Sequence, residues 1–405
     1  MKTFENLAIF LIGFSYSFLI YNKIAFGITL GLGIIILLLT NLNFVLDRSK
    51  NFIVKVKRFD FAIVTFLFLS FTASSFLSIK IERSFAVIIY LVLFIIFSIL
   101  LYLILKEKKN HLNSILKLLS VSLFINSLII LIYNLINYEG FELIKFKGLM
   151  NILSLIAIMN FYFCKSRLNF FSLFFLIPNI YMTGSSAPVL GLISGGFLSL
   201  IFYMIRNSLK RNIASFSFLL ILVFIISSSS FFFSKQLPQR FDSTSIENFE
   251  HKIPINIIDI HRQFIWGFSI NKFKDRYLFG YGPDTSNFIE GSQVEIGLEN
   301  QIYSTGDMNF IPSHPHNFII ELLLETGIIG IILFLLFLII LNIHIFKINR
   351  STKSRVFIVF FNSYFWGSSL VNFSFWLGWW QASFFFILAL LAAKISQHDQ
   401  KELRE

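Results

Sequence analysis

The sequence predicts an all-α integral membrane protein that crosses the bilayer about 12 times. Three observations predict this fold class: 56% of the 405 residues are hydrophobic, only 14% are charged, and the mean hydropathy is +0.75. Apolar runs of about 20 residues, the length that spans a bilayer as a helix, recur along the chain. The short alternating segments of a membrane β-barrel are absent from the sequence.

The apolar runs give the expected spans in chain order. They cover residues 6–22, 26–46, 60–79, 85–105, 114–136, 149–163, 169–183, 187–205, 213–233, 317–346, 356–372 and 376–394. We expect the first run to be a membrane helix rather than a removed signal peptide, because no small-residue cleavage site follows it. Three units result: a bundle of about nine spans over 1–234, a large loop over 235–315, and a bundle of about three spans with a short tail over 316–405.

The basic residues indicate which side of the membrane each loop faces. The formal net charge is +12, from 34 Lys and Arg against 22 Asp and Glu. If the N-terminus is cytoplasmic, the loops predicted inside hold the larger clusters of Lys and Arg. The charge therefore indicates topology rather than nucleic-acid binding, with both termini cytoplasmic and residues 235–315 on the outer face. The single cysteine, Cys164, gives neither a disulfide framework nor a cysteine metal site.

The loop at 235–315 is longer than a simple connection, so we expect it to be functional. Residues 259–273 carry apolar side chains at helical spacing, which predicts an amphipathic helix on the membrane surface. Residues 277–288 are rich in Gly, Pro and Asp and predict a tight turn that positions backbone amides. The Gly280-x-Gly282 pair lacks the preceding strand and following helix that a nucleotide site needs.

His316 and Asn317 stand where the loop becomes a membrane span. On a continuous helix, His316, Gly327 and Gly330 lie within roughly 40° of one line, and the glycines allow another helix to approach closely. Ser313 and Pro315 are typical of helix starts, so we expect His316 in the first turn. There the positive helix end keeps the imidazole neutral and able to accept a proton. The alternative is a histidine that only caps the helix.

A metal site is the less favoured interpretation of this segment. His314 lies two residues before His316, but no carboxylates stand nearby at ligand spacing. We therefore expect no metal here.

Three loop arginines, Arg240, Arg262 and Arg276, lie on the same predicted side of the membrane as His316. A planar guanidinium suits phosphate because it donates paired hydrogen bonds and stays charged. Arg262 precedes Trp266 on the predicted surface helix, where it would face lipid headgroups or a lipid-linked diphosphate. The alternative is a solvated charge.

Glu321 and Glu325 lie one turn apart within the span after His316. A carboxylate there is costly and usually faces the bundle interior. Both project about 140° to 180° away from His316 on a helix, so we expect no direct help to it. Proton-coupled transport is the rival interpretation, but the paired interrupted helices typical of such transporters are not evident in the sequence.

These motifs resemble those of a known family. His316-Asn317, nine residues, Gly327, two residues and Gly330 is similar to the signature of the O-antigen ligase and polymerase superfamily. Arg262, Trp266 and residues 279–283 resemble that family's loop pattern, and the layout of about 12 spans also fits. One element departs: the family often carries Ser-Arg-Gly at the outer end of a middle span, where residues 184–188 contain no arginine.

The resemblance implies a GT-C-like glycosyltransferase of the bacterial inner membrane with its active site on the periplasmic side. It implies inverting, metal-independent and cofactor-free transfer of a glycan from undecaprenyl diphosphate. The acceptor is the lipid A core in a ligase and another lipid-linked glycan in a polymerase. The single large loop before the motif helix favours a ligase. A transporter or flippase is the least favoured alternative.

The resemblance also implies roles for individual residues. His316 is the expected general base that deprotonates the acceptor hydroxyl. Arg262, with Arg240 or Arg276, is expected to stabilise the departing diphosphate. The further residues expected to contact the substrate are Asn317, Trp266, Gly280, Gly282 and His314. The expected partners are the lipid-linked donor, the acceptor and membrane lipids, and no nucleic acid.

Overall fold

The computed structural model describes residues 2–55, 57–140, 143–164, 166–205, 233–239, 241, 253–254, 258–296, 308–348 and 351–402. Helices make up most of these residues. The strands among them are β1 (Glu295–Ile296) and β2 (Met308–Asn309), which form one short antiparallel pair. The predicted all-α class is confirmed.

The described helices follow the predicted spans closely. In chain order they are α1 (Lys2–Leu19), α2 (Lys23–Thr40), α3 (Leu42–Lys55), α4 (Arg58–Phe76), α5 (Ile81–Glu107), α6 (Lys109–Asn137), α7 (Lys147–Phe163), α8 (Arg167–Met182), α9 (Ser186–Ile205), α11 (Ile260–Phe273), α12 (Phe318–Ile348), α13 (Thr352–Ser368) and α14 (Gly378–Glu402). Seven of them are long and apolar enough to cross a bilayer. The chain is therefore a multi-pass membrane protein. The span predicted at 213–233 lies almost entirely outside the described residues, so the total of about 12 stays a prediction.

One predicted span is wrong in its extent. The run at 26–46 was expected to be a single helix, but α2 ends at Thr40 and α3 begins at Leu42. Asn41 lies between them, and its side-chain amide donates to the carbonyl of Leu37 at 2.8 Å. A short polar side chain that bonds the preceding turn competes with the helix ladder, which accounts for the break within an apolar run.

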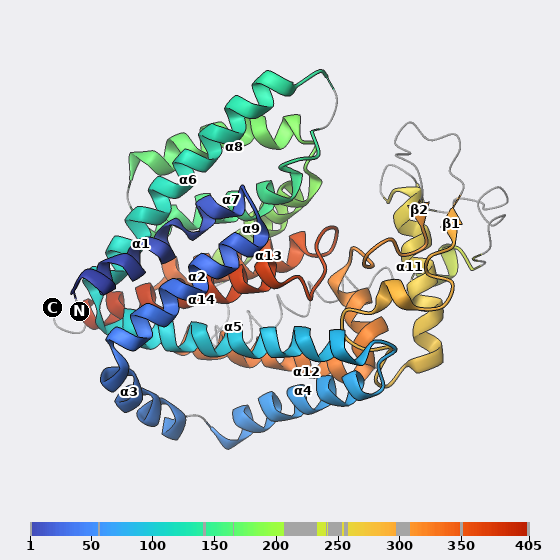
Figure 1. Cartoon of the computed structure of the whole chain (residues 1–405), viewed down its shortest axis with the longest axis horizontal. Helices are drawn as coiled ribbons and strands as arrows, with labels where there is room; N and C mark the ends of the chain where they lie inside the picture. Colours follow the sequence, from blue (N-terminus) through green and yellow to red (C-terminus); the bar gives the residue numbers. More distant parts are fainter. Residues whose placement is uncertain are drawn as a thin grey trace.

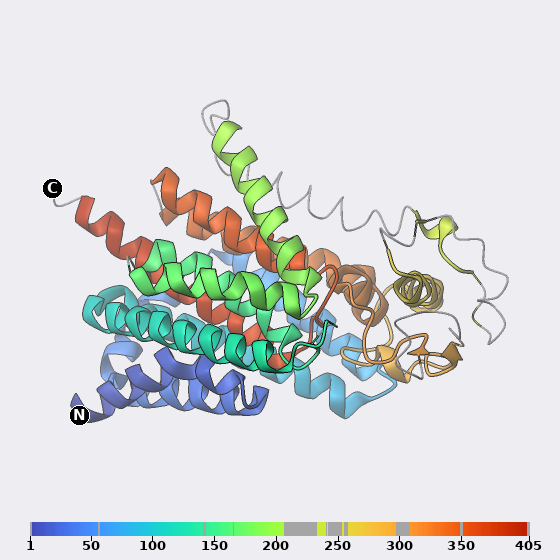
Figure 2. The same ribbon diagram turned by 90° about the horizontal axis from the view of Figure 1, so that it is seen from above.

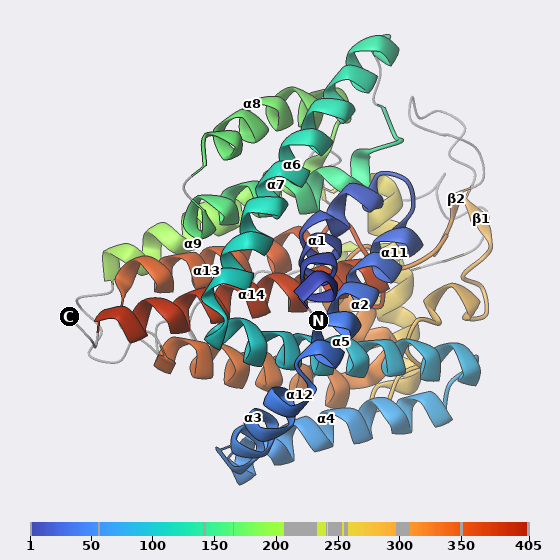
Figure 3. The same ribbon diagram turned by 60° about the vertical axis from the view of Figure 1, so that its left-hand side comes forward.

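The helices form a bundle whose two ends differ. The start of α1 and the end of α14 lie at one end, whereas α11 and the strand pair lie at the other (Figures 1 and 2). Within the bundle α4 packs along α12, α9 along α13 and α5 along α14, as Figure 3 also shows. Aromatic rings fill the core between α13 and α14: the rings of Phe365 and Trp380 stack with centroids 4.1 Å apart. The α11 end is therefore held opposite both termini.

Helix α12 is interrupted at Gly327, where φ is 68° and ψ is −174°. The interruption removes the helical partners of backbone groups on both sides of the glycine. Residues 277–282 replace them: the amide of Tyr281 donates to the carbonyl of Leu324 at 3.0 Å, and that of Gly282 to Glu325 at 2.8 Å. The amide of Ile328 donates in return to the carbonyl of Tyr277 at 2.9 Å. The unpaired backbone groups of a broken membrane helix are thus satisfied by a neighbouring segment.

The two motif glycines have different roles. The prediction that His316, Gly327 and Gly330 lie along one continuous helix is wrong, because the chain leaves helical geometry at Gly327. A Cβ at Gly327 would overlap the carbonyl group of Leu278, so the approaching element there is a loop rather than a helix. At Gly330 an added Cβ would overlap Thr326 of α12 itself, and another helix also approaches closely, as predicted: the ring of Phe71 on α4 would lie 3.3 Å away.

Replacing Gly327 with alanine is expected to destabilise the protein severely. The φ and ψ of Gly327 fall in a region that is essentially restricted to glycine, and the added methyl overlaps backbone that cannot move away. We expect a loss of more than about 3 kcal/mol, seen as a collapse of the thermal transition of the detergent-purified protein. The matched control is Gly196→Ala in α9, where a Cβ meets nothing within 4 Å. It should be neutral or stabilising by up to about 1 kcal/mol. Equal melting of the two variants would contradict the role assigned to Gly327.

Candidate active site

Helix α12 begins two residues after the motif histidine. Its first residue is Phe318, and the side-chain oxygen of Asn317 accepts from the amides of Ile319 at 3.0 Å and Ile320 at 3.2 Å. Asn317 is therefore the cap, because a short amide side chain reaches the free amides of the first turn. The expected place of His316 in the first turn is wrong: it precedes the cap, with a φ of 55°. Asn317 is buried, and its side chain serves as the helix cap.

The proton positions on both histidines follow from a single carbonyl. His316 Nδ1 lies 3.0 Å from the backbone oxygen of Asn372, and His314 Nε2 lies 2.8 Å from the same oxygen. A carbonyl oxygen only accepts, so each of these nitrogens carries a hydrogen and donates it. In the neutral ring, His316 Nε2 is then the unprotonated nitrogen. No hydrogen bond to Nε2 is found among the described residues, so it is available to accept a proton.

Burial holds His316 neutral. Desolvation lowers the pKa of His316 to about 3, with His314 and Arg262 adding smaller decreases. Burial also lowers the pKa of His314, whose ring centroid is 4.1 Å from that of His316. The neutral ring was expected, but its cause is loss of water and nearby positive charge rather than the end of α12. Among the described residues no group of three or more metal-ligating side chains gathers here.

Arg262 meets the same loop as His316. It lies in the first turn of α11, whose cap is Asp259: the Asp259 carboxylate accepts from the Arg262 amide at 2.9 Å. The same carboxylate pairs with Arg262 Nη1 at 2.9 Å, and Nη2 donates to the carbonyl of Val371 at 3.2 Å. Since Val371 and Asn372 are consecutive, the guanidinium and the His316 ring are held on neighbouring carbonyls. These two contacts leave other Arg262 donors for an anion.

Helix α11 forms as predicted, but its apolar face is covered by protein rather than by the membrane surface. The rings of Phe268 and Phe310 stack with centroids 5.6 Å apart, and the cluster around them includes Leu324 of α12. Trp266 is buried, and its indole donates to the carbonyl of Pro315 at 2.9 Å. Trp266 therefore supports the backbone next to His316, and its expected contact with substrate stays a prediction. The amphipathic pattern predicted the helix correctly but did not identify what its apolar face packs against.

Arg276 lies apart from this group. It follows α11 at the end opposite Arg262, about 20 Å away along the helix axis. Its guanidinium donates to the carbonyl of Leu77 at 3.0 Å and lies 4.8 Å from the ring centroid of Tyr281. It also lines a separate open cavity of about 380 Å³ with Asp275. The expected pairing of Arg262 with Arg276 at one diphosphate is not supported, and Arg240 lies outside the described residues.

The predicted tight turn with oriented amides is present, but its amides bind a carboxylate of the protein. Gly280 and Gly282 have φ values of 68° and 107°. The amides that follow, from Asp284, Thr285 and Ser286, donate to Glu325 at 2.7, 3.0 and 2.9 Å. The expected contact of Gly280 and Gly282 with substrate is therefore not supported. Their conformation instead lets the turn approach α12.

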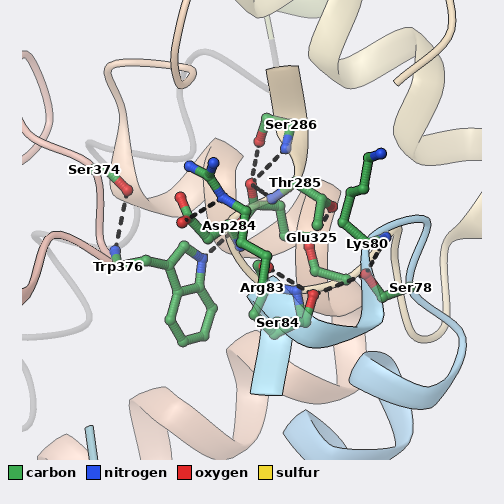
Figure 4. A network of polar contacts seen from close by, with 12 residues as sticks. Ser78, Lys80, Arg83, Ser84, Asp284, Thr285, Ser286, Glu325, Ser374 and Trp376 are labelled. Atoms are coloured by element: carbon green, nitrogen blue, oxygen red, sulfur yellow. Dashed lines mark hydrogen bonds and ion pairs between the residues drawn. The ribbon is translucent and has the colours of Figure 1, made fainter. Parts of the chain in front are cut away.

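Both buried carboxylates of α12 have partners that the sequence did not predict. Glu325 also accepts from the hydroxyl of Ser286 and the indole of Trp376 (Figure 4). Glu321 accepts from the hydroxyl of Ser374 at 2.5 Å and the amide of Phe375 at 2.6 Å. Their expected place inside the bundle is confirmed, with exposed fractions of 0% and 1%. An acidic residue in an apolar span was the available signal, but it did not identify the donors.

Comparison with known proteins identifies relatives. Residues 171–335 match a family model described as O-antigen ligase. The chain is 28% identical over 247 residues to a "Putative polysaccharide ligase" of Rickettsia prowazekii, an alignment covering 60% of this chain and 56% of the relative. A protein of the same name from Rickettsia felis is 29% identical over 60% of this chain and 56% of its own length. That of Rickettsia conorii is 33% identical over 32% of this chain and 31% of its own length. The chain spans about half the length or less of these relatives, and no solved structure matches.

The free energy of unfolding should decrease as the pH is lowered, over a pH range set by His316. Its pKa is lowered from 6.5 to about 3 in the folded protein, so the unfolded chain binds more protons between these values. Stability is then fully present above pH 6.5 and declines as the pH falls toward 3. We expect His316→Asn, whose amide can replace Nδ1–H, to reduce the drop in Tm between pH 7 and 4.5 by about 2 °C or more.

His314→Asn should remove a further part of this pH dependence, because the pKa of His314 is lowered as well. The double variant should show the flattest profile. Thermal unfolding of the purified variants across this pH range measures both effects. A His316→Asn profile parallel to that of the wild type would show that the ring is not buried in its neutral form.

Proposed function

This chain belongs to the O-antigen ligase superfamily, and from that premise we propose that it transfers a glycan from undecaprenyl diphosphate to an acceptor hydroxyl. The observation that carries the proposal is the unprotonated Nε2 of His316 beside the guanidinium of Arg262, both held on consecutive carbonyls of one loop. A base and a fixed cation at one place are what glycosyl transfer from a diphosphate requires.

The proposed reaction uses each group once. His316 Nε2 takes the proton of the acceptor hydroxyl while the oxygen attacks the anomeric carbon of the donor sugar. The bond between that carbon and the diphosphate oxygen breaks on the opposite side, so the configuration inverts. Arg262 stabilises the charge on the departing undecaprenyl diphosphate. The imidazolium that forms still donates Nδ1–H to Asn372, which keeps the ring in place. His314 shares that carbonyl and is proposed to border the acceptor site.

The orientation of the bundle supports a site on the outer face of the bacterial inner membrane. We propose that the end carrying both termini is cytoplasmic, as the basic loops predict. The site lies with α11 at the opposite end (Figure 1). The three predicted units then become a larger bundle, the loop that carries Arg262, and the C-terminal bundle that carries His316 and the loop bonded to it.

A ligase is favoured over a transporter by the way α12 is broken. In transporters, an interrupted helix exposes backbone groups that bind substrate or ions. Here the carbonyls of Leu324 and Glu325 are already occupied by the amides of Tyr281 and Gly282. A polymerase would use the same base and cation, so it remains the alternative. The matching family is described as O-antigen ligase and the relatives are named polysaccharide ligases, which favours a ligase, and we propose lipid A core as its acceptor class.

Substitutions at the two proposed catalytic residues should strongly lower the rate of transfer without unfolding the protein. We expect His316→Ala to lower the rate by about 10²- to 10⁴-fold, because the acceptor loses its base. Arg262→Lys should lower it by about 10²-fold, since lysine cannot donate in a planar fork. Arg276→Lys is the matched control and should retain most activity. Transfer is measured with purified protein, a lipid-linked glycan and an acceptor glycolipid. A normal rate in His316→Ala would reject the base, and equal loss in both arginine variants would reject the choice of Arg262.

A deletion strain should separate the two enzyme types. Loss of a ligase leaves the core without long chains while the lipid-linked polymer accumulates. Loss of a polymerase leaves a single repeat on the core. Gel electrophoresis of surface glycolipids, with separate analysis of the lipid-linked pool, distinguishes these patterns. We expect the ligase pattern, and single-repeat glycolipid would instead assign polymerase activity.

A further inference from the structure

The loop between α13 and α14, residues 369–377, carries both carbonyls that orient the candidate catalytic groups. Val371 accepts from Arg262, and Asn372 accepts from His314 and His316. The tautomer of His316 therefore depends on where this loop lies. A shift of about 1 Å at the Asn372 oxygen would lengthen the 3.0 Å bond beyond the normal range for hydrogen bonds.

Glu321 fixes the loop immediately after Asn372. Its two carboxylate oxygens accept separately, from the hydroxyl of Ser374 and from the amide of Phe375. All three residues are buried, so water does not replace these bonds if they break.

Glu321 and His316 belong to one short stretch of chain. Glu321 lies in the first turn of α12, and the amide of Glu321 donates to the carbonyl of the cap residue Asn317 at 2.9 Å. His316 directly precedes that cap. The chain from His316 to Glu321 and the loop from Asn372 to Phe375 are thus joined at both ends, by the imidazole–carbonyl bond and by the carboxylate bonds.

We propose that Glu321 is a positioning residue that sets the tautomer of His316. By holding Ser374 and Phe375 it holds the carbonyl of Asn372, which keeps the hydrogen on Nδ1 and leaves Nε2 free to accept a proton. Glu321 needs no contact with substrate for this role. Only the effect on activity rests on the proposed function, because the tautomer is a property of the protein alone.

The loop has other contacts besides Glu321, and after Asn372 the side-chain amide of Gln381 donates to the carbonyl of Phe375 at 2.6 Å. The amide of Phe318 donates to the carbonyl of Ser369 at 3.2 Å, and Arg262 bonds Val371. Both precede Asn372. Glu325 bonds the indole of Trp376, a side-chain contact that leaves the backbone at Asn372 free to turn. Gln381 bonds Phe375 alone, whereas Glu321 bonds both Ser374 and Phe375 and joins them to the first turn of α12.

The direct test is the protonation state of the His316 ring in the full-length protein. In ¹⁵N-histidine-labelled protein in lipid nanodiscs, solid-state NMR distinguishes Nδ1–H from Nε2–H. We expect wild type to show one tautomer at His316, with Nδ1 protonated, and Glu321→Ala to show a mixture. His344, whose Nε2 bonds Asp60 at 2.7 Å in another part of the bundle, is the internal control and should not change.

Kinetics with the lipid-linked glycan donor supply the second readout. We expect Glu321→Ala to lower kcat by about tenfold or more, because a histidine in the wrong tautomer is a poor base. The donor KM should change by less than about twofold, since no donor contact is removed. Glu321→Gln should recover most of the rate, because its oxygen can accept from Phe375 and its amide can donate to Ser374. Glu107→Ala is the control: it removes a partly exposed carboxylate that pairs with Arg48 at 3.6 Å and should retain wild-type kcat.

The outcomes separate the two proposals. A single Nδ1–H tautomer and an unchanged kcat in folded Glu321→Ala would overturn the positioning role, as would Nε2–H in the wild type. A tautomer change without any transfer by the wild-type protein would contradict the proposed function while supporting the role of Glu321. If Glu321→Ala does not fold, Ser374→Ala removes one of the two bonds and should still broaden the His316 tautomer signal. An unbroadened signal in that variant would count against the proposal.

Discussion

Two buried carboxylates on an interrupted helix are the constraint on which the rest of this structure depends. In a bilayer, neither a carboxylate nor an unpaired backbone group finds water, so each must be satisfied by protein. Helix α12 carries Glu321, Glu325 and the break at Gly327 within a few turns. Its donors come from two segments far apart in the sequence, 277–286 and 374–376. Helix α12 therefore determines where both segments lie. Displacing either segment would leave buried polar groups unpaired and greatly reduce the free energy of unfolding.

The candidate active site is a consequence of this arrangement. The segment at 277–286 bonds residues 324–328 of α12, and the loop at 369–377 bonds the first turn of the same helix. The carbonyls of that loop then face the start of α11 and the residues before α12. Arg262 and His316 meet there although they come from different elements, and neither lies within a membrane span. The polar groups inside the bundle thus hold the geometry, while the groups that would act on substrate stay at its edge.

Part of this site was predictable, and the physical reasons differ between residues. His316 and Arg262 were predicted because an imidazole suits proton transfer, a guanidinium suits a diphosphate, and both were expected on one side of the membrane. The turn at Gly280 and Gly282 was predicted from composition, but its amides bind Glu325, because a local pattern does not specify which acceptor it meets. The helix that carries Trp266 was expected at a membrane surface and instead packs against protein, since amphipathicity shows that one face is apolar without identifying what covers it. Arg276 was expected beside Arg262, but the length of α11 separates them.

The sequence by itself determined the all-α membrane class, the approximate bounds of the described spans and the polar loop that bears Arg262. These follow from local hydropathy and charge, because a bilayer imposes a fixed length and a helical backbone on each crossing. Only the tertiary structure decided that α12 breaks at Gly327, that Asn317 rather than His316 caps it, and that Asn372 selects the histidine tautomer. Each of these depends on contacts between residues dozens of positions apart or on competition between neighbouring caps. Such contacts arise from the path of the folded backbone, which no local pattern specifies.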